Sequence, residues 1–88
     1  MATFNLFIGS NNKTKRLEVD KIERIMNKRH KGYTVEYCFG YWQGKKEKSA
    51  KVLVTDDGDL IMQSVKELKR ELQQDSIAYQ EAPELSFA

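Results

Sequence analysis

The sequence contains only one cysteine, one histidine and one proline in 88 residues. A disulfide needs two cysteines, so the lone Cys38 excludes an internal disulfide and favours a reducing compartment, which we expect to be the cytoplasm. No apolar run approaches the roughly 18 residues that span a bilayer, so we expect no membrane partner. Residues 1–10 lack a basic segment and a small-residue cleavage pattern, which argues against a signal peptide.

The scarcity of histidine and cysteine also limits metal binding and catalysis. His30 and Cys38 lie eight positions apart and have no second soft ligand at a usual spacing. The acidic run 56–59 lacks the full calcium-loop pattern, and the polar loop 9–15 lacks the residue order of a phosphate loop. We therefore expect no metal, no cofactor and no enzyme activity. An enzyme would need a site assembled across subunits from Glu36, Glu47, Tyr41 or His30.

Length and charge limit the size of the fold and its partners. We predict one domain over residues 1–81, followed by a tail at 82–88 that is either frayed or docks through Leu85 and Phe87. A chain this short buries only about 60–65% of its unfolded surface, which favours assembly into a dimer or a larger homo-oligomer. Residues 1–52 hold 12 Lys and Arg against 5 Asp and Glu. Residues 53–88 hold 3 against 8.

This uneven charge permits three interpretations. The basic half could attract a phosphate-bearing ligand, and the two halves of different copies could meet head to tail. Scattered charges on a small domain can also simply face solvent. Composition alone leaves the three open.

Hydrophobic spacing predicts six structural elements. The apolar positions of the first helix recur at helical spacing before Gly32, and residues 33–42 alternate as a strand does. A lysine-rich connection at 43–48 separates this strand from the next, and the acids at 56–59 suit a helix cap. The predicted elements are strands at 4–8, 33–42, 49–55 and 75–81, a helix at 17–31, and a helix carrying Ile61, Val65, Leu68 and Leu72.

The order β-α-β-β-α-β predicts an α+β ferredoxin-like sandwich, with a four-stranded antiparallel sheet and two helices on one face. Helices that cover the face of Leu6 and Val52 would leave Phe7 and Leu53 on the open face, together with Trp42. An apolar open face in so small a domain favours a subunit interface. The opposite assignment of faces also stays open.

Two lysine-bearing loops, at 11–15 and 44–48, suggest a binding site. The first leads into a helix whose N-terminus could receive an anion. Aromatic rings beside the second could stack on a base next to a neutralised phosphate, with asparagines contacting polar edges. The alternative is a charged hairpin tip whose tryptophan packs for stability. The candidate ligand-binding residues are Asn11, Asn12, Lys13, Lys15, Tyr41, Trp42, Lys45 and Lys46.

Two segments resemble a group of small proteins carried by phages and other mobile elements. They are Gly32-Tyr33-Thr34-Val35, and Gly40-Tyr41-Trp42-Gln43-Gly44 with Glu47 and Ser49. The opening Leu6-Phe7-Ile8-Gly9-Ser10-Asn11-Asn12-Lys13 is similar as well. The resemblance extends to about Gln80 and implies an origin rather than an activity. Phage proteins of this size often look like inhibitors of host defence.

Together these features predict a non-enzymatic, homo-oligomeric phage protein. It would sequester a phosphate-bearing ligand, such as a cyclic nucleotide immune signal, and so act as a sponge that inhibits host defence. The alternative is a protein-interaction module that binds and blocks a host defence protein.

Overall fold

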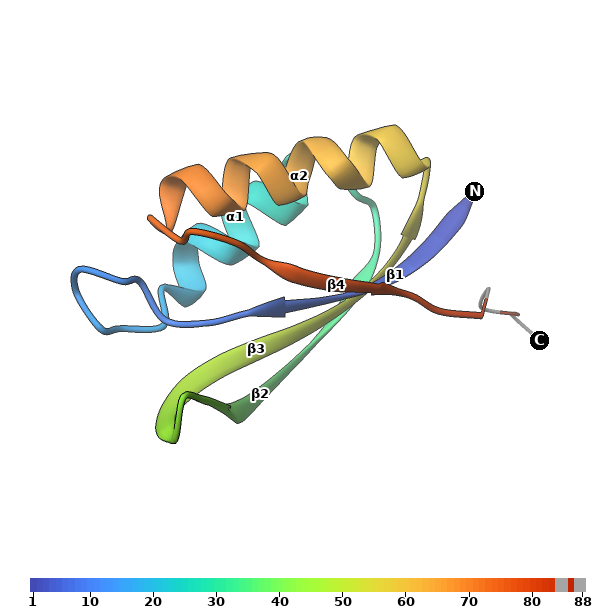
Figure 1. The fold of residues 1–88 in the computed structure, drawn as a ribbon. Coiled ribbons are helices and arrows are strands. Elements are labelled where there is room, and N and C mark those ends of the chain that lie inside the picture. The colour runs from blue at the N-terminus through green and yellow to red at the C-terminus, as the bar shows by residue number, and fades with distance from the viewer. Residues whose placement is uncertain (84–85, 87–88) are drawn as a thin grey trace.

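The computed structural model describes residues 1–83 and 86, and it contains one sheet and two helices (Figure 1). The elements are β1 (Ala2–Ile8), α1 (Val19–Arg29), β2 (Tyr33–Trp42), β3 (Lys45–Asp56), α2 (Gly58–Glu71) and β4 (Ala78–Glu81). The strands lie in the order β2-β3-β1-β4, and every neighbouring pair is antiparallel. Both helices cover one face of the sheet (Figure 1). The predicted α+β ferredoxin-like fold is confirmed, whereas Leu85 and Phe87 lie outside the described residues.

Local sequence explains where the helices begin and end. The Asp57 carboxylate caps α2 by accepting hydrogen bonds from the backbone N–H groups of Asp59 (2.9 Å) and Leu60 (3.4 Å). The acidic turn is therefore a helix cap, as predicted. The basic residues Lys28 and Arg29 fill the last turn of α1, where positive charge interacts favourably with the helix dipole.

The core lies between the sheet and the helices. In β1 and β3 the register places Leu6 opposite Val52 and Ile8 opposite Ala50, and all four side chains are buried. The helices contribute Ile22, Ile25, Met26, Ile61, Val65 and Leu68, and Leu72 follows directly after α2. Because successive strand residues point to opposite faces, Phe7 and Leu53 lie on the open face, as one of the two predicted assignments required.

β3 begins earlier than the sequence suggested. Residues 45–48 were predicted as a connection, yet they pair with β2, from Trp42 opposite Lys45 to Phe39 opposite Lys48. The actual connection is a two-residue turn in which Gln43 has φ of 51° and Gly44 has φ of 77°. Two positive φ values match the tight turn that joins twisted antiparallel strands. The lysines are therefore strand residues with a fixed direction.

Two other elements are shorter than predicted. The first helix spans Val19–Arg29 rather than 17–31, because Leu17 packs on the core from the preceding loop and the backbone at His30 is extended. The last strand spans Ala78–Glu81 rather than 75–81. Ile77 is buried immediately before it, so the apolar signal at that position came from packing.

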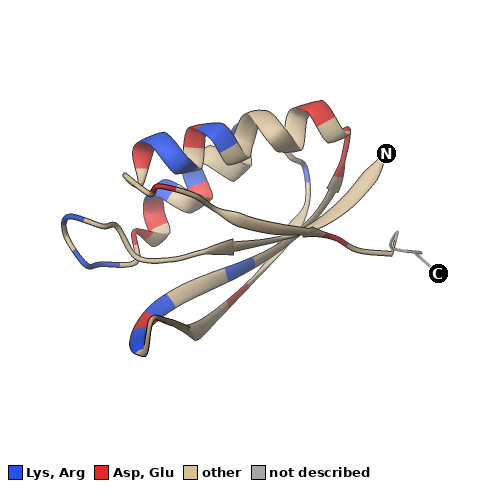
Figure 2. Ribbon diagram, viewed as in Figure 1, with Lys and Arg blue, Asp and Glu red and all other residues tan. Residues whose placement is uncertain are grey.

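The β2–β3 hairpin extends beyond the rest of the sheet. β1 pairs with β3 only as far as Ile8 opposite Ala50, while β2 and β3 continue to Trp42 opposite Lys45. We call the extension, Cys38–Ser49, the hairpin arm. It projects away from the helices in Figure 1, and Figure 2 shows lysines near its tip. Among the described residues, no helix is long and apolar enough to cross a membrane.

A buried polar network joins the C-terminus of α1 to α2 and β3. The ring of His30 lies 2.7 Å from Asp56 (Nδ1 to Oδ2) and 2.8 Å from Ser64 (Nε2 to Oγ). Arg29 forms an ion pair with Glu67 at 2.8 Å, and Lys28 pairs with the same carboxylate. Every partner is a side chain from another element, so the network fixes how the helices sit on the sheet.

The same network predicts a loss of stability in acid. The hydrogen bond from His30 lowers the pKa of Asp56 below its ordinary 3.8, and Lys28 and Arg29 lower the pKa of Glu67 below its ordinary 4.5. A carboxylate whose pKa is lowered by folding stabilises the folded state fully at pH values above its ordinary pKa. This stabilisation is lost as the pH falls through the lowered pKa of the folded state. We expect Asp56→Asn to be less stable than the parent at pH 6, with the difference narrowing below pH 3.8. Urea unfolding across this range measures it, and a constant difference would contradict the assignment.

Candidate functional site

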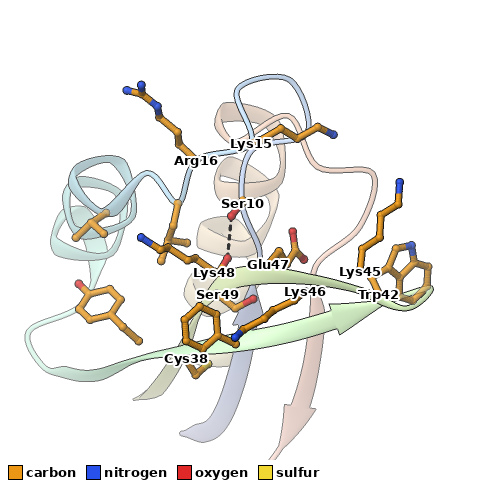
Figure 3. A pocket seen from close by; sticks show the side chains of 14 residues that line it. Ser10, Lys15, Arg16, Cys38, Trp42, Lys45, Lys46, Glu47, Lys48 and Ser49 are labelled. Carbon is orange, nitrogen blue, oxygen red and sulfur yellow. Dashed lines mark hydrogen bonds between the residues drawn. The ribbon is translucent and has the colours of Figure 1, made fainter.

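A groove of about 1130 Å³ lies where β3 continues past the end of β1 (Figure 3). One wall is the hairpin arm, and the other is the loop between β1 and α1. The two walls are joined at Ser10, whose hydroxyl donates a hydrogen bond to the carbonyl of Lys48 at 2.8 Å. Gln74 donates to the carbonyls of Gly9 and Ser10 from the other side, at 2.6 and 2.9 Å. The base of the groove is thus held by backbone and side-chain bonds.

The groove is strongly basic. The loop supplies two of its cations and the arm supplies three, namely Lys15, Arg16, Lys45, Lys46 and Lys48. Within the described part of the chain, Glu47 is the only acidic residue that lines it. The excess of positive charge in a concave surface favours an anionic ligand.

Three aromatic rings line the same groove: Tyr37, Phe39 and Trp42. Trp42 is 72% exposed, so its ring does not pack within the fold of a single chain. The Lys46 ammonium lies 4.1 Å from the centre of the Phe39 ring, which pairs a cation with a stacking surface. Partial burial and the Glu23 carboxylate raise the pKa of Tyr37 above its ordinary 10.0.

Tyr41 and Trp42 point to opposite faces of β2 because they are adjacent in a strand. Tyr41 lies outside the groove and lines a second recess with Phe7, Gly9 and Ala78. Trp42 lines both the groove and the second recess, whereas Tyr41 lines the recess alone. Tyr37 and Phe39 lie on the face of β2 that Tyr41 occupies, and they line the groove nearer its base.

The Glu47 carboxylate sits over the end of β1 because Gly9 leaves room for it. A Cβ at position 9 would lie 2.6 Å from Glu47 Oε1, closer than real side chains approach. Gly40 leaves room for Ser49 in the same way, since a Cβ there would lie 2.8 Å from the hydroxyl. Two glycines thus place a carboxylate and a hydroxyl at the junction of the groove and the second recess.

We expect Gly9→Ala to displace Glu47 while the fold is kept. Glycine-to-alanine changes stabilise proteins by about 0.4–1 kcal/mol where the alanine fits, because they restrict the unfolded chain. Gly32→Ala is the matched control, since nothing lies within 4 Å of its added Cβ. Urea unfolding should show a gain for Gly32→Ala and none for Gly9→Ala. An equal gain in both variants would mean that Glu47 does not occupy the space at Gly9.

The loop before α1 is organised by Asn11, which is almost fully buried. Its Oδ1 accepts hydrogen bonds from the backbone N–H groups of Lys13 (2.8 Å) and Thr14 (3.1 Å). Its backbone N–H donates to the carbonyl of Arg16, at 2.8 Å. Asn11 therefore shapes the loop that presents Lys15 and Arg16, and its amide is already hydrogen-bonded within the fold.

The N-terminus of α1 does not contribute a free anion site. Glu18 occupies the N-cap position, where its carboxylate pairs with Lys21 at 3.0 Å. A negative side chain already lies at the positive end of this helix dipole. The cations of the groove come instead from the loop and from β3.

The sequence identified part of this site. Of the predicted ligand-binding residues, Lys15, Trp42, Lys45 and Lys46 line the groove, whereas Asn12 and Lys13 are exposed on the loop outside it. Four other lining residues were not predicted from the sequence, namely Arg16, Lys48, Tyr37 and Phe39. The tight turn at Gln43 and Gly44 was the missing signal, because it sets Phe39 opposite Lys48.

Another cluster has the geometry of a catalytic triad without access to substrate. The two ring nitrogens of His30 are hydrogen-bonded to Asp56 and to Ser64, in the order found in Ser-His-Asp triads. However, Ser64 and the ring of His30 are fully buried, and Arg29 also donates to the Ser64 hydroxyl, at 3.4 Å. This cluster is structural. Among the described residues, no group of three or more potential metal ligands exists.

Comparison with known proteins identifies similar folds and no related sequence. No family model and no curated protein matches the sequence. A DUF3240 family protein from Shewanella baltica has a similar structure, with a TM-score of 0.67 at 11% identity over 98% of this chain and 92% of the other. The divalent ion tolerance protein CutA1 from Ehrlichia chaffeensis gives a TM-score of 0.57 at 8% identity, over 97% of this chain and 85% of the other.

A phage SAM lyase in its apo state is also similar, with a TM-score of 0.56 at 15% identity over 90% of this chain and 78% of that one. At these identities the similarity establishes a shared architecture. The chain has the ferredoxin-like fold that all three of these proteins display.

Proposed function

We propose that this protein is a homo-oligomeric binding protein, of a phage type, that sequesters a phosphate-bearing nucleotide in the groove beside the hairpin arm. The observation that carries the proposal is that five cations and three aromatic rings line one groove, to which both faces of the hairpin arm contribute. Aromatic rings stack on bases regardless of sequence, and lysines neutralise phosphates. Both kinds of group must act on one ligand for a nucleotide to be retained.

In this arrangement Trp42 is the most exposed ring and stacks on the base at the mouth of the groove. Lys45 and Lys46 flank it from the arm, while Lys15 and Arg16 approach from the loop. The groove is open to solvent, which suits capture and release of an intact ligand. Sequestration of an immune signal would make the protein an inhibitor of host defence.

A thermal-shift screen of the purified protein against cyclic mono-, di- and trinucleotides tests the proposal. A ligand that binds only the folded state adds about 2.7 kcal/mol of stability at one hundred times its dissociation constant. We expect one nucleotide to raise the melting temperature and to be recovered unchanged by chromatography. A flat panel, together with co-purification of one host protein, would replace this proposal with the protein-blocking alternative.

Glu47 favours a second candidate, a nucleoside that carries a positive charge. A single half-buried carboxylate among five cations suits a ligand with both signs of charge. S-adenosylmethionine has this chemistry, with a stacking base, a sulfonium and a carboxylate. The fold is shared with a phage SAM lyase, which supports including this compound in the panel.

In this second candidate, the Glu47 carboxylate would interact with the sulfonium. The same contact would be available if this protein cleaved the ligand. Incubation with S-adenosylmethionine followed by chromatography separates binding from turnover. Glu47→Gln keeps the side-chain size and removes the charge, so it should abolish binding of the sulfonium ligand. The same variant should bind a nucleotide anion at least as well as the parent, which distinguishes the two candidates.

A further inference from the structure

The two outer edges of the sheet differ in how they are protected. Edge strands expose unpaired backbone groups, and proteins protect them with short length, charges or proline. β4 has only four residues and ends at Glu81. β2 is the other outer strand, with ten residues, no proline and Glu36 as its only charge. β2 therefore presents an unusually long and unguarded edge.

The same strand carries most of the exposed aromatic surface. Tyr37, Phe39, Tyr41 and Trp42 are between 55% and 72% exposed. Tyr37, Phe39 and Tyr41 share one face of β2, and at about 200 Å² for each ring they present roughly 360 Å² of largely apolar surface. A standard interface buries about 800 Å² on each partner, so this face supplies nearly half of one.

Charge indicates which surface would cover this edge. The arm behind β2 carries Lys45 and Lys46 near its tip. A parallel pairing of two β2 edges would bring two arms of the same sign side by side, and an antiparallel pairing would leave each arm without an acidic partner. The β4 edge carries exposed acids instead, with Asp75 before the strand and Glu81 at its end. A β2 edge with basic neighbours is therefore complementary to a β4 edge with acidic ones.

We propose that copies of this chain assemble head to tail, with the β2 edge and hairpin arm of one copy against the β4 edge of the next. Such heterologous contacts form a closed ring when the rotation between copies closes. The Tyr79 ring is half exposed on β4 and provides an apolar surface within the acidic edge. This interface specifies the self-association in the proposed function, and it shares Lys45, Lys46 and Trp42 with the groove proposed for the ligand.

Charge reversal tests the interface. We expect light scattering after size exclusion to give an oligomer for the parent chain at micromolar concentration. Lys45→Glu with Lys46→Glu, and separately Asp75→Lys with Glu81→Lys, should each reduce assembly at least tenfold. The chain that carries all four substitutions should restore the oligomer, because each reversed edge then meets its complement in a ring of any size. Circular dichroism controls for folding, since all four side chains are exposed.

The outcomes are distinct. A monomeric parent chain would overturn the proposal, as would reversed variants that keep the parent size. Failure of the chain with all four substitutions to assemble would also overturn it, and loss of assembly only in the Lys45→Glu, Lys46→Glu variant would indicate that β2 edges pair with each other. The thermal-shift screen reports on the ligand independently, so an oligomer without any nucleotide hit would refute the proposed ligand and leave this interface intact.

Discussion

His30→Ala is expected to lower the free energy of unfolding by roughly 2–5 kcal/mol, the range for truncating a large buried side chain to alanine. The His30 ring is fully buried and bonds to both Asp56 and Ser64. Its loss leaves the Ser64 hydroxyl without its imidazole partner and opens a cavity under the end of α1. Urea denaturation followed by circular dichroism measures the change.

Lys31→Ala is the matched control, because Lys31 is the exposed neighbour of His30 in the chain. Exposed substitutions away from special contacts usually change stability by less than about 0.5 kcal/mol. His30→Gln can keep one of the two bonds and should fall between the control and the alanine variant. A His30→Ala variant as stable as Lys31→Ala would show that the network does not hold the helices.

Trp42→Ala is expected to remove the stabilisation that a bound nucleotide provides, about 2.7 kcal/mol at one hundred times the dissociation constant. The free protein should lose less than about 0.5 kcal/mol, because the indole is mostly exposed and contributes little to the core. Thermal shifts measured with and without the ligand give both values.

Tyr41→Ala provides the comparison, since Tyr41 lies next to Trp42 in β2 but outside the groove. We expect this variant to keep most of the ligand response. Equal losses in the two variants would place the ligand at the second recess or across both faces of the arm. A large drop in the stability of free Trp42→Ala would contradict its exposed position.

The fold could be predicted from the sequence because its signals are local. The alternation over 33–42 matched β2 at both ends, and the apolar stripe from Ile61 to Leu72 marked α2. The acidic turn before α2 carried its own capping chemistry. The start of β3 was not predicted because a lysine-rich segment at 45–48 is typical of a loop. Residues 45–48 also lack the alternation of apolar residues that indicates a strand.

The candidate site was harder to predict because it depends on contacts between distant segments. The groove depends on the hydrogen bond between Ser10 and Lys48, which are separated by 38 positions. No local sequence pattern predicts this hydrogen bond. The role of Gly9 is similarly hidden, since it depends on the side chain of Glu47. Residues such as Asn11 looked like ligand contacts because a polar loop gives the same signal whether its amides face inward or outward.

The extension of the hairpin arm beyond β1 has a consequence for how the protein could diversify. Its residues contribute little to the buried core, so substitutions there leave the stability of the remaining fold nearly unchanged. Its backbone should also exchange amide hydrogens faster than that of β1, since local opening costs less where few apolar contacts hold the chain. Selection can therefore alter recognition at the arm without a compensating change in the core, and one scaffold can give rise to proteins with different ligands.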